Sequence, residues 1–189
     1  MCTLVLLLAL TISGFECPES TEPRHRTTVE ARESWCERPG GVRHGPRHAW
    51  HAEGSKWFEG SYDDGKREGP WRFWFQGGAK RSESVYRNDR RHGAMIQWYE
   101  SGVVHVKGVC QEGVEHGTWE RFQPNASKEA RATFEKGKLV AAQYWSRRGL
   151  PIDINEFVIE KARAKPGDAR HDRALAAYQK NAGFDACGE

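Results

Sequence analysis

Three histidines of this sequence recur at a spacing that could suggest a metal site. His44, His92 and His116 each stand directly before a glycine, and these glycines belong to a series with a period of 24 residues. If each unit is one β-hairpin, equivalent positions lie two strands apart, about 10 Å, whereas zinc holds its imidazole nitrogens at about 2.0–2.1 Å. One ion cannot bridge that row, and His48 and His51 would point to opposite faces of a strand. We therefore expect no metal site.

The sequence carries no other signature of catalysis. No glycine-rich segment has the spacing of a dinucleotide or phosphate loop, and no Gly-Lys-Ser/Thr stretch occurs. The spacing brings together no nucleophile with a base and no pair of carboxylates. The formal net charge of +3 is small and the charges are interspersed, which argues against a nucleic-acid surface. We expect a protein that is not an enzyme, needs no cofactor and binds no nucleic acid.

The glycines are the framework of a tandem repeat. Gly45, Gly69, Gly93 and Gly117 are each 24 residues apart, with no insertion or deletion between them. Counted from each glycine, position +5 is aromatic, and position +20 is Gly, Asp, Gly and Gly. Position +9 is Gly, Gly, Gly and Ala, so two turn signals alternate with two short aromatic-rich segments. This is the pattern of one β-hairpin per repeat, and it predicts a mainly β array of about four repeats over residues 44–146.

The aromatic residues predict a core face and a binding face. Within each unit we place strands at positions +1 to +7 and +11 to +18, for example residues 70–76 and 80–87. If +7 pairs with +11, the +5 tryptophan, the small +15 residue and the +17 tyrosine share one face, which we predict to be the core. The other face is part aromatic and part charged, the composition of a binding patch, unless the C-terminal helices or the N-terminal leader cover it. The predicted partner-binding residues on that face are Trp71, Phe73, Phe75, Met95, Tyr99 and Trp119.

The repeat motif resembles a known family. The pattern Gly-x-Trp-x-x-Trp-Phe/Tyr-x-x-Gly followed by Gly-x-Tyr-x-x-Gly-x-x-x-Gly is seen best over residues 68–75 and 96–117, and it resembles the MORN (membrane occupation and recognition nexus) variant repeat. The resemblance covers about residues 44–140. It implies a single-layer antiparallel sheet of stacked hairpins and no catalytic residue. It also implies a role as a scaffold, as a lipid- or protein-binding module, or as an antitoxin-like protein.

The N-terminal region predicts export. Residues 4–12 form an apolar run too short to span a bilayer, which needs about 20 residues, but of the length of a signal-peptide core. We expect residues 1–16 to be a signal peptide and the protein to reach the periplasm or outer envelope. The alternative is a buried N-terminal segment of a cytoplasmic protein.

The cysteines leave more than one possibility open. Cys17 is either lipidated, which would anchor the protein, or joined to Cys36 in a disulfide. The segments around these two cysteines resemble the leaders of exported bacterial proteins with such repeats, and this resemblance favours the disulfide. Cys110 stands in a row otherwise filled by Tyr or Phe, so we predict a small buried hydrophobe there. Cys187 receives no assignment.

The two ends of the array differ from its middle. Residues 17–43 are polar and contain several Pro and Gly, so we expect a loop-rich leader in which Trp35 covers the first edge of the sheet. Residues 147–189 are expected to form a helical cap or tail, with one helix beginning near Asp153 and a second over about residues 168–181.

These features together predict an exported bacterial repeat protein, without enzymatic activity, whose aromatic sheet face binds or scaffolds a protein partner. One alternative is an antitoxin-like protein that neutralises a toxin and stays reduced in the cytoplasm. Another is a module for an anionic membrane surface that uses the row Lys56, Lys80 and Lys128, although such a row is more often a solvated stripe.

Overall fold

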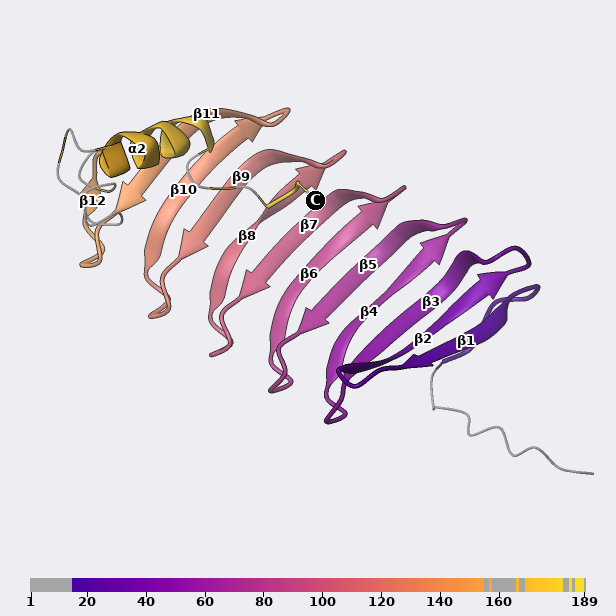
Figure 1. Ribbon diagram of the computed structural model, residues 1–189. Helices are drawn as coiled ribbons and strands as arrows, with labels where there is room; N and C mark the ends of the chain where they lie inside the picture. Colours follow the sequence, from indigo (N-terminus) through magenta and orange to yellow (C-terminus); the bar gives the residue numbers. More distant parts are fainter. Residues whose placement is uncertain are drawn as a thin grey trace, which may run out of the picture.

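The described part of the chain forms a single antiparallel sheet. The computed structural model describes residues 15–154, 157, 166, 169–181, 184 and 186–188, so the predicted signal peptide up to residue 14 and most of the first predicted C-terminal helix lie outside it. The sheet has 12 strands, and each strand pairs with the next one in the sequence (Figure 1). The chain is therefore mainly β, an open layer of tandem hairpins with a short C-terminal helical segment, as predicted. The elements are β1 Glu22–Thr27, β2 Ala31–Arg38, β3 Val42–His51, β4 Lys56–Asp63, β5 Lys66–Trp74, β6 Lys80–Arg87, β7 Arg90–Trp98, β8 Val104–Gln111, β9 Val114–Phe122, β10 Lys128–Glu135, β11 Lys138–Trp145, β12 Pro151–Ile152 and α2 Ala169–Asn181.

Two kinds of turn alternate along the array. Between β4 and β5, Asp64 and Gly65 have φ values of 44° and 81°. Positive φ at both central residues is the geometry of a type I′ turn, whose twist matches that of the flanking strands. At the opposite edge the loops are longer, and each is closed by a backbone hydrogen bond such as that from Phe75 N–H to the Ala79 carbonyl, 2.8 Å. The glycines at positions +9 and +20 are therefore turn residues, whereas the framework glycines Gly45, Gly69, Gly93 and Gly117 lie within strands and also have positive φ.

The segment 17–43 is not the loop-rich leader that the sequence predicted, because β1 and β2 form a further hairpin of the same sheet. In the 24-residue frame, Gly40 and Gly41 occupy the two turn positions and have φ values of 91° and 80°. Glu22 lies opposite Glu37, which is the same pairing of positions +1 and +16 as in the later hairpins. This hairpin is a degenerate repeat, hidden in the sequence because Arg26 and Arg38 occupy its aromatic positions +5 and +17, and Thr21 and Glu30 replace two of its glycines. With β11 and β12 at the other end, the array runs over residues 22–152.

The strand register differs by one residue from the predicted one. Trp71 lies opposite Ser84, so position +2 pairs with +15, and a β-bulge beside Phe73 and Trp74 then pairs Trp74 with Lys80. Because side chains alternate between faces, a slip of one residue exchanges the two faces of the sheet. The +2 side chains are consequently the core, while the +5 tryptophans are half-buried on the other face.

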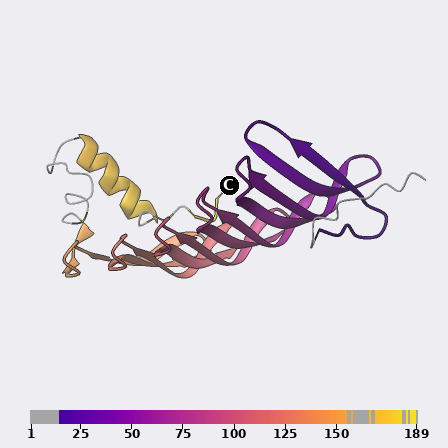
Figure 2. The same cartoon turned by 90° about the horizontal axis from the view of Figure 1, so that it is seen from below.

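We call the face that carries Trp71, Met95 and Trp119 the inner face. These three side chains are 3%, 1% and 0% exposed. Strands β1 and β2 at one end and α2 at the other rise on the same side of the sheet (Figure 2). The inner face is thus covered at both ends by parts of the chain itself.

The C-terminal end of the inner face is closed by the last residues of the chain. Phe157, Phe184 and Cys187 are buried and belong to one hydrophobic cluster with Trp119 and Phe134. Cys110 is buried, as predicted from its row, but the sequence did not reveal that it forms a disulfide with Cys187, 77 residues further along. This bond fixes the tail to β8.

At the N-terminal end, strands β1 and β2 bend over the inner face of the sheet (Figure 2). Arg47 donates a hydrogen bond of 2.9 Å to Glu33 of β2, and its guanidinium lies 4.9 Å from the centre of the Phe58 ring. Cys17 and Cys36 form a disulfide, the pairing that the resemblance favours, with Cα atoms 5.6 Å apart. The first hairpin is therefore tied both to β3 and to the segment that precedes it.

The opposite, outer face is a ladder of lysines on aromatic rings. Lys56 Nζ lies 5.0 Å from the centre of the Trp74 ring, and Lys80 Nζ lies 5.5 Å from that of Trp98. Each lysine also pairs with a carboxylate, Lys56 with Glu59 at 2.8 Å and Lys80 with a glutamate at 3.1 Å. The predicted lysine row is therefore paired with acidic groups on this face.

Within the described residues, no helix has the length and apolarity needed to cross a bilayer.

Candidate functional site

The uncovered middle of the inner face contains a groove of about 590 Å³. Its lining residues Arg91, near the start of β7, and Tyr99, just after the end of β7, are eight positions apart (99 − 91), about 26 Å of extended backbone at about 3.3 Å per residue. An extended peptide of about eight residues has the same length. The groove is lined by Phe73, Phe75, Arg81, Ser82, Arg91, Gln97, Trp98, Tyr99, Glu100 and His105.

Aromatic rings cluster in the part of the groove that lies toward Tyr99. The Tyr99 ring lies 4.5 Å from that of His105, and its hydroxyl donates a hydrogen bond of 3.0 Å to the Phe122 carbonyl. Burial, together with the negative charge of Glu129, raises the pKa of Tyr99, so its hydroxyl stays protonated at neutral pH. Phe73 and Phe75 are half-buried, which leaves part of each ring open to a ligand.

Two arginines contribute positive charge to the groove. Arg81 places its guanidinium 6.0 Å from the centre of the Phe75 ring, and Arg91 lies 5.5 Å from that of Tyr86. Arg91 also donates to the Gly188 carbonyl, while its buried Nε has no hydrogen-bond partner. Among the ion pairs of the described residues, neither arginine has a carboxylate within 4.0 Å.

Half of the predicted partner-binding residues lie elsewhere. Trp71, Met95 and Trp119 are core residues, so their prediction as a binding surface is wrong. The physical reason is the one-residue register shift, which turns the +2 row toward the covered face. The structure brings together the other three, Phe73, Phe75 and Tyr99, in the groove.

The residues that sequence reasoning missed in the groove include Arg81, Arg91, Gln97 and His105. Arg91 had a sequence signal, because Arg43 and Arg67 precede it at the same 24-residue spacing. The other three had none, since their neighbours in the groove come from strands whose register the sequence did not reveal.

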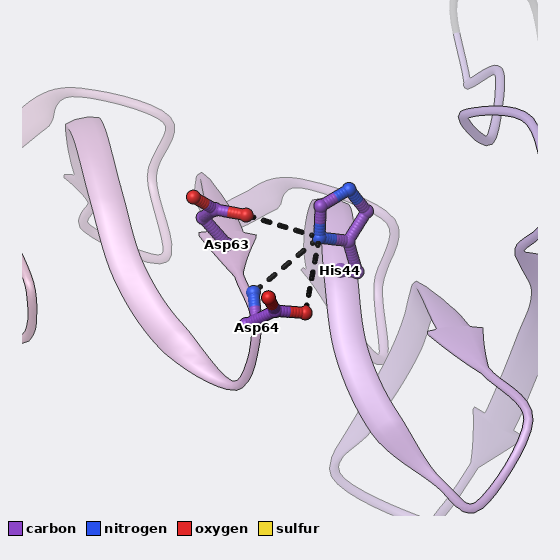
Figure 3. Close-up of side chains that lie close together, drawn as sticks. All are labelled: His44, Asp63 and Asp64. Atoms are coloured by element: carbon purple, nitrogen blue, oxygen red, sulfur yellow. Dashed lines mark hydrogen bonds and ion pairs between the residues drawn. The ribbon is translucent and has the colours of Figure 1, made fainter.

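His44 lies close to two carboxylates, which raises the question of a metal site (Figure 3). Its Nδ1 lies 3.2 Å from Asp63 Oδ1 and accepts a hydrogen bond of 3.3 Å from the Asp64 backbone N–H. Arg38 donates to Asp64 and places its Nη2 3.2 Å from His44 Nε2, so a guanidinium already supplies the positive charge at this position. We assign no metal role to the group.

The recurrence of histidine before the repeat glycines has a structural explanation. In the next repeat Glu68 takes this position, and it accepts a hydrogen bond of 2.9 Å from the Asn88 N–H at the equivalent turn. His92 lies 2.8 Å from Glu112, again in the equivalent turn. The residue before the glycine therefore holds the neighbouring type I′ turn, and either His or Glu can do this.

A serine and a histidine also come within hydrogen-bond distance. His25 Nδ1 lies 2.9 Å from Ser34 Oγ, because the two residues are directly opposite each other in β1 and β2. Ser34 is only 3% exposed, so its hydroxyl is not accessible to a substrate. The pair is a cross-strand contact and does not form a nucleophile with its base.

Comparisons with known proteins do not identify a family for this chain. No family model and no curated protein matches the sequence. Among solved structures, the chain is similar to a glycosylation-associated protein (Gap123) complex from Streptococcus agalactiae, with TM-score 0.33, 14% identity and coverage of 59% of this chain and 20% of that one. It is also similar to TarM, with TM-score 0.32, 8% identity and coverage of 65% and 21%. A third similarity is to accessory secretory protein 1, 2 and 3 of Streptococcus pneumoniae, with TM-score 0.27, 13% identity and coverage of 87% and 30%. This chain thus spans less than a third of each matched structure.

Proposed function

We propose that this chain is a repeat module without enzymatic activity that binds a protein partner, and that the inner-face groove receives a segment of that partner. The observation that carries the proposal is the groove itself, in which Phe73, Phe75 and Tyr99 lie beside charged side chains in the uncovered middle of the sheet. Aromatic rings and arginines in a concave, partly desolvated site are the residues that dominate protein–protein recognition.

The disulfides support a location outside the cytoplasm. Cys17–Cys36 and Cys110–Cys187 indicate an oxidising environment, since such bonds are rare in the reducing cytoplasm. We place the protein in the periplasm or outer envelope. The sulfur of Cys17 is bonded to Cys36, so the proposal includes no lipid anchor at Cys17. A cytoplasmic, reduced antitoxin fits two disulfides less well.

The outer face supports a protein partner over an anionic membrane. Lys107 and Lys128 both bond Glu120, at 3.2 and 3.3 Å, and Lys107 lies 5.4 Å from the centre of the Phe122 ring. Lysines that are already paired offer little net positive charge to lipid head groups. The groove is therefore the better candidate for the binding surface.

The proposal is tested with a photo-crosslinking amino acid in living cells. The photoreactive residue replaces Phe75 in the groove, and in a matched control it replaces Val109, which is 43% exposed. Val109 follows the core residue Gly108 by one position and faces the outer side. We expect a discrete crosslinked protein from position 75 and not from position 109. Equal crosslinking at both positions, or none at position 75, would refute a protein-binding groove.

A further inference from the structure

We infer that the groove binds an extended acidic peptide segment, with an aromatic side chain among Phe73, Phe75 and Tyr99 and carboxylates facing Arg81 and Arg91. The inference rests on the proposed function, and it adds the chemistry of the partner segment. Three features of the inner face support it: the way the chain's own tail is held, the charge of the groove and its length.

The C-terminal tail shows how the inner face holds an aromatic side chain. Phe184 is 2% exposed and is the anchor of the tail. Its ring lies 6.0 Å from that of Trp119 and 6.1 Å from that of Phe134, and the Arg121 guanidinium lies 5.0 Å from its centre. The inner face therefore holds an aromatic side chain by surrounding it with other aromatic rings and one guanidinium group.

The backbone of the tail is held by charged side chains. Glu115 accepts hydrogen bonds of 2.9 and 3.1 Å from the Ala186 and Cys187 N–H groups. Arg91 stands 24 residues before Glu115, at the equivalent position of the preceding repeat, and it donates to the Gly188 carbonyl. This repeat position therefore binds the tail backbone in two ways: Glu115 accepts hydrogen bonds from N–H groups, and Arg91 donates one to a carbonyl.

The groove begins where the tail contacts end, because Arg91 touches Gly188 and also lines the groove. It repeats the elements that hold Phe184: the half-buried rings of Phe73, Phe75 and Tyr99, and a guanidinium, that of Arg81, 6.0 Å from the centre of the Phe75 ring. An aromatic side chain of a partner would occupy this place as Phe184 occupies its own.

The charge of the groove selects an acidic segment. Two arginines and a single carboxylate, Glu100, are among the described lining residues. Arginine and carboxylate groups form charge-assisted, often bidentate hydrogen bonds, and Arg81 and Arg91 are both among the lining residues. Arg91 lies opposite Tyr86, which is five positions along β6 from Arg81 (86 − 81), so about five extended residues, about 16 Å, separate their two acidic partners.

The test uses synthetic peptides and the full chain with its disulfides intact. The first probe is a fluorescein-labelled eight-residue peptide with Glu at its second and seventh positions, Phe next to one of them and Ser or Thr elsewhere. A second probe has Lys in place of each Glu, and a third has Ser in place of Phe. Fluorescence anisotropy at low salt should show saturable binding of the first probe and at least tenfold weaker binding of the other two.

A charge reversal identifies the contact. Arg81→Glu should weaken binding of the acidic probe about three- to tenfold and strengthen binding of the lysine probe. Arg87→Glu makes the same change in net charge at an exposed position of the same strand outside the groove, and should change neither affinity by more than about twofold. Circular dichroism confirms that both variants fold.

The outcomes separate this inference from the proposed function. Equal binding of acidic and lysine probes, or equal effects of Arg81→Glu and Arg87→Glu, would overturn the acidic assignment. If no peptide binds while position 75 still crosslinks a protein in cells, the peptide chemistry is wrong and the groove remains a protein-binding site. If neither peptide binding nor crosslinking occurs, both proposals fail.

Discussion

The sharpest prediction concerns Gly60, because a side chain at this position has no room. A Cβ atom there would lie 2.2, 2.3 and 2.7 Å from three ring atoms of Trp71. The indole cannot retreat easily: its N–H donates to the Ser61 carbonyl at 3.2 Å, and Tyr62 packs edge-on against it at 5.2 Å. Forcing extra atoms into a packed core costs about 1–3 kcal/mol, and the close approach places Gly60→Ser near the upper value, about 3 kcal/mol.

The chain itself supplies the rescuing substitution. Position +15 of one repeat faces position +2 of the next repeat, 11 residues further along. Where position +2 is Trp71 or Trp119, position +15 is Gly60 or Gly108. Where the +15 residue is Ser84, the residue opposite is Met95. Trp71→Met should therefore make room for a serine at position 60. In that background Gly60→Ser should cost less than about 1 kcal/mol, a coupling of about 2 kcal/mol.

The assay is chemical denaturation with disulfides intact, followed by circular dichroism and fluorescence, using the free energy of unfolding only where the two transitions coincide. Gly77→Ser is the matched control, because a Cβ there lies 3.7 Å from a flexible Glu100 oxygen and should cost less than about 0.5 kcal/mol. Trp74→Met, on the outer face, should give no rescue. Equal costs of Gly60→Ser in the Trp71→Met and Trp74→Met backgrounds would refute the register described above.

Three further predictions follow from the disulfides, the charges and the His44 group. Removing the Cys110–Cys187 disulfide by a double Ser substitution should lower the free energy of unfolding by about 4 kcal/mol on the loop-entropy model, because it closes a long loop; a loss below about 1 kcal/mol, measured in urea, would show that the tail is held without it. Burial raises the pKa of Glu120, but its hydrogen bonds from Lys107, Lys128 and Arg131 outweigh this and hold the pKa below its usual value. Its stabilising effect is therefore present above about pH 4.3 and is lost as the pH falls through the lower folded-state pKa, so Glu120→Gln should flatten the acid side of a stability-against-pH curve, and an unchanged curve would contradict the pairing. Addition of Zn²⁺ should leave Tm unchanged, and a rise that His44→Gln abolishes would show that His44, Asp63 and Asp64 do bind a metal.

The sequence predicted the features of the fold that depend on turns. Type I′ geometry needs positive φ at two successive residues, and only a few residue types adopt it readily, so Asp64-Gly65 and Glu112-Gly113 mark their turns in the sequence. The 24-residue period then follows, as does the meander of hairpins. The first hairpin was missed although Gly40 and Gly41 keep the period, because its strands have exposed charged residues where the later ones have rings.

The faces of the sheet could not be predicted in the same way. Both Trp71 and Trp74 stand in one strand on opposite faces, so aromatic content does not identify the core face. The bulge beside Trp74 changes the alternation, and no residue type announces it. A usable signal was present in the array, because a small residue stands 11 positions before each core residue: Gly60 before Trp71, Ser84 before Met95 and Gly108 before Trp119. Glycine precedes the two large tryptophans, and the larger serine precedes the smaller methionine.

The position of the groove follows from how the two ends of the array are closed. A single-layer sheet leaves both faces to solvent, and here the outer face covers its rings with paired lysines, whereas the inner face depends on other parts of the chain. The first hairpin covers one end and the tail, fixed by Cys110–Cys187, covers the other. The described residues of these two segments do not line the groove with Phe75 and Tyr99, whose rings stay half-exposed in the middle repeats. Leaving these rings open costs stability, because burying an aromatic ring is favourable. A bound partner segment would recover that free energy, and this is the physical reason to place the binding function in the middle of the array.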